Sequence, residues 1–128
     1  MLGANLYNYV NVLDKAADAS WTRLQVISNN LANVSTPHYK RKDVEFESYL
    51  KRELTKDGSL DHRVATADLD SLNSTIYTDN VSLSYRLDGN NVDIDTETSY
   101  QARTQIKYNA ILDSMTSEFS RIRAVLGK

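Results

Sequence analysis

Apolar and small residues in the first third of the chain recur at alternating steps of four and three positions. The series runs without interruption through Leu6, Val10, Leu13, Ala17, Ser20, Leu24, Ile27, Leu31 and Val34. This heptad pattern predicts a long α-helix from about Asn5 to Asn33. The apolar stripe is narrow, which is typical of a helix that packs along one side against another helix. Pro37 marks the end, because proline cannot continue a helix and biases the residue before it toward an extended backbone.

The other end of the chain shows a matching pattern. Steps of four and three residues connect Tyr108, Leu112, Met115, Phe119, Ile122 and Leu126. They predict a second long helix from Thr96 to Leu126, with Asp95 as its N-cap and Gly127 at its end. Since both helices have a narrow apolar stripe and nearly equal length, we expect them to pair side by side.

The region between the two helices has a mixed and more polar pattern. Asp43 is expected to cap a short helix whose apolar face carries Phe46, Leu50 and Leu54. The run Thr75–Thr78 is followed by Asp79-Asn80 and then by Val81–Tyr85, in which apolar and polar residues alternate, so this stretch predicts a β-hairpin. Residues 60–72 show no firm period.

The predicted fold is therefore mainly α-helical. The long N- and C-terminal helices are expected to pair as a coiled-coil-like bundle, with a small irregular middle region that holds the short helix and the hairpin. The expected parts are an N-terminal helix at 1–36, a middle region at 37–94 and a C-terminal helix at 95–128.

Composition narrows the class of protein. The chain has 128 residues, a formal net charge of −2 and no cysteine, which excludes disulfides and thiolate metal sites. Apolar residues, counted with glycine but without tyrosine, are scarcer than the roughly 45–50% of typical globular domains. The triplet Lys40-Arg41-Lys42 is interpreted as solvated surface rather than a phosphate site. The chain therefore lacks core unless it packs against other chains, and no nucleic acid is expected as a partner.

Catalytic and metal-binding motifs are missing from the sequence. His38 and His62 are far apart, all four glycines are isolated, and no serine lies in a nucleophile elbow. A calcium loop starting at Asp88 fails on ligand spacing, since Val92 occupies position 5 and no glutamate occupies position 12. We expect no enzyme activity, no cofactor and no small-molecule substrate.

Three asparagines stand near the end of the first helix, where this mediocre helix former needs a reason. Asn33 could end the helix in a left-handed conformation. Alternatively, Asn29, Asn30 and Asn33 could use their amide groups to bind a neighbouring chain. The pattern does not decide between the two.

Two stretches resemble a known family. Asn29-Asn30-Leu31-Ala32-Asn33, followed by Thr36-Pro37 and Tyr39-Lys40, resembles the N-terminal signature of bacterial flagellar rod and hook proteins. That family usually has glycine after the proline, where this chain has His38. Arg86–Asp95 resembles the stretch before the C-terminal helix in a proximal rod protein of this family, on the residues Leu87, Asp88, Gly89, Asn90, Asn91, Val92 and Asp93.

The resemblance implies a structural subunit of the proximal rod of the flagellar basal body, on the periplasmic side of the cell envelope. Its terminal helices would form the inner tube, polymerising into the drive shaft and export channel. Implied partners are copies of itself, other rod proteins, the membrane-ring and base adaptor proteins, and the flagellar export apparatus. The two helix stripes would then form a seam between subunits, on Leu6, Val10, Leu13, Leu24, Ile27 and Leu31 and on Tyr108, Leu112, Met115, Phe119, Ile122 and Leu126.

Export would follow a route of its own. Met1–Asn5 has no positive region and no apolar run follows it, so no cleavable signal peptide and no membrane insertion are expected. Phe46 and Leu50 resemble the aromatic and hydrophobic pair with which early flagellar substrates dock on the export gate. Simple packing in the middle region is the other interpretation of this pair.

Two alternative functions remain at this point. One is a different flagellar axial subunit, such as the second proximal rod protein. The other is a cytosolic coiled-coil adaptor.

Overall fold

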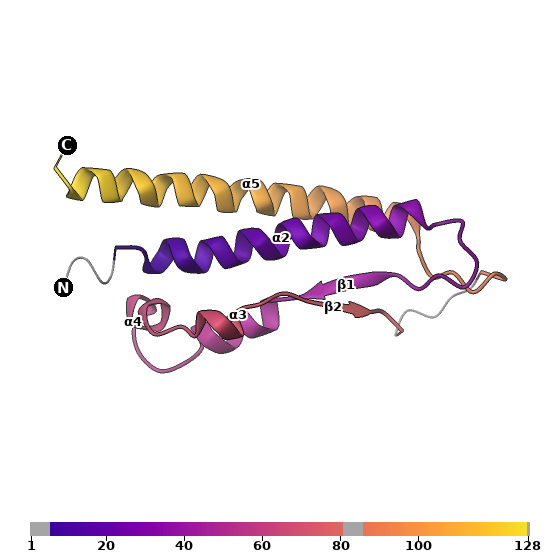
Figure 1. Cartoon of the computed structure of the whole chain (residues 1–128), viewed down its shortest axis with the longest axis horizontal. Coiled ribbons are helices and arrows are strands. Elements are labelled where there is room, and N and C mark those ends of the chain that lie inside the picture. The colour runs from indigo at the N-terminus through magenta and orange to yellow at the C-terminus, as the bar shows by residue number, and fades with distance from the viewer. Residues whose placement is uncertain (1–5, 81–85, 128) are drawn as a thin grey trace.

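The computed structural model describes residues 6–80 and 86–127. Two long helices dominate it, and a small region of short helices and strands lies beside them (Figure 1). In chain order the elements are α2 (Asn8–Ala32), β1 (Lys42–Glu45), α3 (Glu47–Leu54), α4 (Leu60–Ala65), the 3-10 helix η1 (Leu69–Ser71), β2 (Thr75–Thr78) and α5 (Ile94–Val125).

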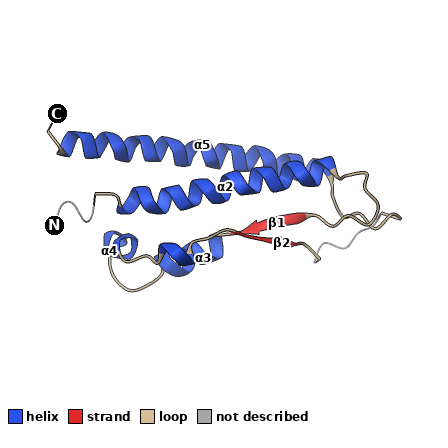
Figure 2. Cartoon of the chain, in the orientation of Figure 1, coloured by secondary structure: helices blue, strands red, loops and turns tan. Residues whose placement is uncertain are grey.

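The molecule is elongated, and α2 lies between α5 and the middle region (Figures 1 and 2). The chain runs along α2 to one end of the molecule, forms the middle region and returns along α5, so the two long helices are antiparallel. The predicted mainly α-helical fold with paired terminal helices and a small middle region is confirmed. Among the described residues, no helix is both long and apolar enough to cross a membrane.

The apolar stripe of α2 is wider than the heptad pattern indicated. Val12 and Ala19, which lie outside that pattern, are buried against the middle region. There they join Phe46, Val64 and Leu72 in the hydrophobic core. The expectation of a narrow stripe was wrong because α2 is covered on two sides, by α5 and by the middle region.

The short helix α3 begins later than expected. Its N-cap position is Phe46, and no side chain caps it. Asp43 lies in β1 instead, where its carboxylate is 3.5 Å from the guanidinium groups of both Arg23 and Arg41. The prediction that Asp43 caps this helix was wrong, because the chain stays extended to pair with β2.

The two strands form an antiparallel sheet in which Lys42 faces Thr78 and Glu45 faces Thr75. The predicted strand at 75–78 is confirmed, but its observed partner is β1, which the sequence did not indicate. The second run of the predicted hairpin, 81–85, lies outside the described residues.

The long helix α5 starts two residues before the predicted position. Its N-cap is Asp93, whose carboxylate accepts a hydrogen bond from the backbone N–H of Thr96 at 3.3 Å. Asp95 lies inside the first turn, so its prediction as N-cap was wrong. Asp93 rather than Asp95 has the extended backbone that an N-cap requires, with φ −110° and ψ 120°.

Candidate functional site

The two family-like stretches are far apart in sequence but meet where α2 ends and α5 begins (Figure 1). The backbone N–H of His38 donates to the carbonyl of Asp88 at 2.7 Å, and the Lys40 ammonium donates to the carbonyl of Gly89. The N–H of Asn91 donates to Tyr39 across the same contact at 3.4 Å. We call the segments 29–42 and 86–97, joined in this way, the motif junction.

Asn90, in the second family-like stretch, contacts the chain just after the end of α2. Its side chain is fully buried, and its Nδ2 donates to three backbone carbonyls at 2.8–3.0 Å, those of Asn33, Val34 and Thr36. Its Oδ1 accepts from the N–H of Val92 at 2.7 Å. Carbonyls at a helix C-terminus lack partners within the helix. A side chain of the second stretch thus holds the turn that follows α2, from its C-cap residue Asn33 onward.

Asn33 does not cap α2 in the way proposed from sequence. Its backbone has φ −104° and ψ 15°, outside the left-handed region, and its side chain donates back to the carbonyl of Asn29 at 2.8 Å. The left-handed expectation was wrong because Asn90 supplies the donors that such a turn would otherwise provide. Thr36 completes the turn by donating its hydroxyl to Asn33 Oδ1 at 3.1 Å.

The left-handed residue is His38, six positions after the last residue of α2. Its φ is 61°, a conformation that glycine adopts at lower cost. His38 faces Gly89, itself at φ 76°, and a Cβ on Gly89 would lie 3.0 Å from His38 Nδ1. The chain therefore keeps a glycine-type turn after Pro37 although histidine occupies the position.

Asn30 is fully buried and uses both ends of its amide. Its Nδ2 donates to the carbonyl of Lys42 at 2.8 Å and to Glu97 Oε2 at 3.1 Å. Its Oδ1 accepts from the Lys42 N–H at 2.9 Å and from the Tyr39 hydroxyl at 3.1 Å. An amide has two donor hydrogens and two acceptor lone pairs. The hypothesis of a bond to a neighbouring chain was wrong for Asn30, because its capacity is used within the chain.

Arg41 is buried between two carboxylates. Its Nε donates to Glu97 at 2.5 Å, its Nη1 donates to Asp79 at 2.8 Å, and the ring of Tyr100 lies 5.4 Å from the guanidinium. Burial alone would lower the pKa of Arg41, but its hydrogen bonds to Glu97 and Asp79 raise that pKa above its ordinary value. The interpretation of residues 40–42 as solvated surface was wrong for Arg41. The one signal in the triplet is residue type, since arginine is preferred to lysine for buried ion pairs.

Asn91 ties the junction to the end of β2. Its Oδ1 accepts from the backbone N–H of Arg41 at 2.6 Å, and its Nδ2 donates to the carbonyl of Asp79 at 2.9 Å. Of the other residues in this stretch, Val92 is buried and Leu87 is fully exposed. The contacts thus involve the polar members of the stretch and leave Leu87 at the surface.

A second ionic cluster, away from the motif junction, joins α2, the middle region and α5. The Arg23 guanidinium holds Glu47 through two hydrogen bonds of 2.5 and 2.7 Å, and Lys107 of α5 donates to the same carboxylate at 2.7 Å. The hydrogen bonds from Arg23 and then Lys107 lower the pKa of Glu47 to about 2. The cluster borders a cavity of about 330 Å³, which Ile27 and Thr104 also line.

The helix-stripe residues proposed as a seam differ in burial. In the N-terminal stripe Val10 and Ile27 are buried, whereas Leu6, which precedes α2, and Leu13, Leu24 and Leu31 are half-buried. On α5, Ile122 is buried and Tyr108 and Met115 are half-buried. The remaining members of the C-terminal stripe, Leu112, Phe119 and Leu126, are exposed.

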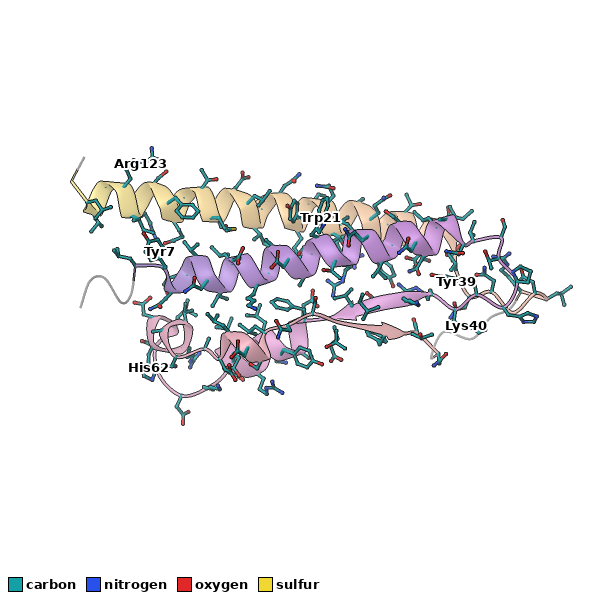
Figure 3. The ribbon with its side chains drawn as sticks, viewed as in Figure 1. Tyr7, Trp21, Tyr39, Lys40, His62 and Arg123 are labelled. Carbon is teal, nitrogen blue, oxygen red and sulfur yellow. The ribbon has the colours of Figure 1, made fainter. Side chains whose placement is uncertain are left out.

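Trp21, an aromatic residue that flanks the α2 stripe, lies at the surface of the folded chain. It stands on α2 midway along the molecule (Figure 3), with 52% of the residue exposed. Its ring centroid lies 6.0 Å from that of Tyr108 on α5. It is the only tryptophan of the chain, and this was the one signal in the sequence that could have marked the surface position.

Phe46 and Leu50 lie together in the folded protein. Phe46 is buried in the hydrophobic core, and Leu50 packs against that core. Their side chains are thus accessible as a pair only in the unfolded chain. Within residues 6–80 and 86–127, no group of three or more candidate ligands is placed to hold a metal ion.

Comparison with known proteins gives a consistent result. A family model described as flagella basal body rod protein matches residues 11–40, which include the first family-like stretch. The flagellar basal body rod protein FlgB of Bacillus subtilis is 34% identical over 129 residues, covering 98% of this chain and 95% of the relative. FlgB of Borreliella burgdorferi is 32% identical, covering 81% and 84%, and FlgB of Salmonella typhimurium is 30% identical, covering 81% and 82%. The chain therefore belongs to the FlgB family of flagellar basal body rod proteins.

Proposed function

We propose that the chain is a structural subunit of the proximal rod of the flagellar basal body, where it polymerises to help form the drive shaft and export channel. The observation that carries this proposal is the exposed apolar surface of α5, which includes Phe119, Val125 and Leu126. Large apolar surfaces on a soluble chain mark interaction sites. In a family of rod proteins, the natural cover for this surface is a neighbouring subunit.

The two helix stripes and the motif junction have different roles in this proposal. The exposed members of the C-terminal stripe make contacts between subunits, and the half-buried members of both stripes keep α2 and α5 paired within a subunit. The junction fixes the angle between α2, β1 and α5, because Asn30, Arg41 and Glu97 bond across all three elements. It therefore shapes the subunit rather than contacting its neighbours.

The proposed partners are copies of this chain, the other rod proteins, and the membrane-ring and base adaptor proteins. The chain has no catalytic role in this scheme. It reaches the rod through the flagellar export apparatus as an unfolded polypeptide.

For export, we propose that Phe46 and Leu50 dock on the export gate before they join the core. The pair lies four residues apart, and its burial in the folded protein requires docking to precede folding. The same residues are needed for packing afterwards.

The rod proposal is tested by isolating basal bodies from the bacterium that encodes the chain. We expect the chain in the rod fraction, loss of the rod and of motility when its gene is deleted, and recovery when the gene is returned. Intact rods in the deletion strain would overturn the proposal.

The export proposal is tested separately with Phe46→Ala in cells that cannot assemble a rod. Docking predicts a sharp fall in secretion with an unchanged amount of chain in the cytosol. Val64→Ala, which removes a different core side chain, is the matched control and should be secreted normally. Undiminished secretion of the Phe46→Ala chain would leave the pair with a packing role alone.

A further inference from the structure

Two exposed helix faces carry matching sets of three residues. On α2 the set is Asp14, Asp18 and Trp21, and on α5 it is Phe119, Arg123 and Leu126. In both sets the members are four and three residues apart, which places them on one face of a helix. The first set is acidic and aromatic, and the second is basic, aromatic and aliphatic.

The α2 set lines a groove with a volume of about 320 Å³. Leu112 and Met115 of α5 provide its apolar side. Both carboxylates are exposed, and neither has an ion pair within the described part of the chain. The groove therefore offers an aromatic ring and two carboxylates that form no ion pair with residues 6–80 and 86–127.

The α5 set is equally open. Phe119 and Leu126 are 45% and 66% exposed. Figure 3 shows Arg123 close to the C-terminal end of α5, on the side away from α2. Its neighbour Arg121 is paired with Glu118 at 3.1 Å, whereas Arg123 has no ion pair among residues 6–80 and 86–127.

Trp21 and Arg123 do not meet within one molecule. Trp21 rests on Tyr108, and Arg123 follows Tyr108 by 15 residues, a distance of about 22 Å along a helix. A long arginine side chain does not span this separation. Asp18 lies only one turn of α2 from Trp21, so a pairing of Asp18 with Arg123 must join two molecules.

We propose that the face formed by Asp14, Asp18 and Trp21 binds the C-terminal face of α5 from a second copy of this chain. Because α2 and α5 are antiparallel within a subunit, they are also antiparallel between two subunits that point in the same direction. In that arrangement Trp21 meets Phe119, Asp18 meets Arg123, and Leu126 lies beside Asp14. The inference rests on the proposed function and specifies the contact between copies.

Charge complementarity and the head-to-tail arrangement both favour a second copy of this chain as the molecule that binds the α2 face. Within the described residues Arg123, Asp14 and Asp18 form no ion pair, so their opposite charges can complement each other between copies, and Trp21 and Phe119 can form an aromatic pair. The contact uses two different surfaces, so each added copy presents a further face of each kind, and the copies join head to tail in a ring or a helical row. The copies are offset lengthwise by about 16 Å, because Phe119 lies 11 residues beyond Tyr108.

Cysteine cross-linking tests this contact directly, because the natural chain has no cysteine. One copy carries Asp18→Cys and another carries Arg123→Cys, both are expressed in the same cells, and isolated basal bodies are oxidised. We expect a cross-linked dimer of this chain. The matched control replaces Ser117, on a different face of α5, and should give no dimer.

Two outcomes overturn the proposal. A cross-link to a chain of different mass would mean that another rod protein covers Trp21. The absence of any cross-link, in basal bodies that contain both variants, would remove the contact while leaving the rod function intact. If the variants are missing from basal bodies that do form, the proposed rod function itself fails.

A charge exchange provides the second measurement. Asp18→Arg or Arg123→Asp alone should reduce motility at least tenfold, and the two together should restore it, because the pair is re-formed with reversed sign. Circular dichroism of each purified variant should match the parent chain, since both positions are exposed. Equal defects in the double and single variants would contradict the proposed pairing.

Discussion

The motif junction and the C-terminal end of α5 solve opposite problems in one short chain. At the junction, Asn30, Asn90 and Glu97 are fully buried, and their polar atoms are bonded within the molecule. At the far end of α5, Phe119 and Leu126 are apolar and face solvent. Polar groups are thus placed where shape must be fixed, and apolar groups where a partner is expected.

This difference teaches how the stability of a subunit and its assembly can be separated. Buried polar groups are costly when a partner is removed, so the junction tolerates few alternatives to its observed geometry. Exposed apolar residues contribute little to the folded monomer. Substitutions in the two regions should therefore give different phenotypes, and the following measurements compare them.

The largest effect is expected at Glu97. Glu97→Ala leaves the buried Arg41 with an uncompensated charge and removes an acceptor of Asn30, so unfolding free energy should fall by about 3–5 kcal/mol. Urea denaturation of the purified chain measures the loss. Asp95→Ala, an exposed acid two residues earlier in α5, should cost less than about 1 kcal/mol. Similar losses for the two variants would mean that the buried pair has no special weight.

A smaller loss is expected at Asn90. Asn90→Ala removes the donor for three carbonyls at the end of α2 and the acceptor for Val92, which should cost about 2–3 kcal/mol in the same assay. Asn29→Ala changes the same residue type at an exposed position of the junction and serves as control. Equal stability of the Asn90→Ala chain and the parent would show that water replaces this cap.

His38 offers a gain rather than a loss. His38→Gly should stabilise the chain by about 1 kcal/mol, because φ 61° costs less for glycine than for a residue with a side chain. Thermal unfolding should show a higher midpoint. His62→Gly, placed inside the helix α4, should instead lower it. A lower midpoint for His38→Gly would mean that the imidazole itself contributes to the junction.

Acid should weaken the ionic cluster around Glu47. Hydrogen bonds from Arg23 and Lys107 hold the folded-state pKa of Glu47 at about 2, below its unfolded value of roughly 4.3. The contribution of Glu47 to stability is therefore present above pH 4.3 and is lost as the pH falls toward 2. Because this carboxylate is half-exposed, the effect should be less than about 1 kcal/mol.

The measurement compares Glu47→Gln with the parent chain between pH 7 and pH 2. The stability difference between them should shrink as the pH falls. A constant difference over this range would rule out an ionic contribution from Glu47.

The smallest effect on the monomer is expected at Phe119. Phe119→Ala should change unfolding free energy by no more than about 0.5 kcal/mol, because the residue is 45% exposed and lies outside the hydrophobic core. Rod assembly in cells should nevertheless decrease. A large loss of monomer stability would mean that Phe119, like the junction residues, stabilises the subunit itself.

The sequence predicted the elements that local pattern determines. Heptad spacing located α2 and α5 to within about three residues at each end, because a long helix repeats its signal many times. The strand β1 was missed, since Lys42–Glu45 is mostly charged and becomes a strand only through pairing with β2 and with the Asn30 side chain. Tertiary contacts outweighed local propensity at that point.

The candidate site was predicted only in part, for a related reason. Both family-like stretches were located, but their contact depends on the path of the intervening middle region. Arg41 and Glu97 were not selected, because a buried ion pair and two exposed charges look the same in sequence. Trp21 lies on the flank of the α2 stripe, where the pattern gives no preference for burial or exposure.

The long reach of the junction contacts also determines how the chain folds in time. Asn30 and Glu97 are 67 residues apart, yet each contributes to the other's burial. Helical proteins usually fold fast because their contacts are local, whereas contacts of this range must first close a long loop. The α2 helix therefore has to wait for the last quarter of the polypeptide before its end can be fixed. The end of α2 therefore stays unfixed while most of the chain has already been synthesised or transported. The subunit reaches its final shape only when that process is nearly complete.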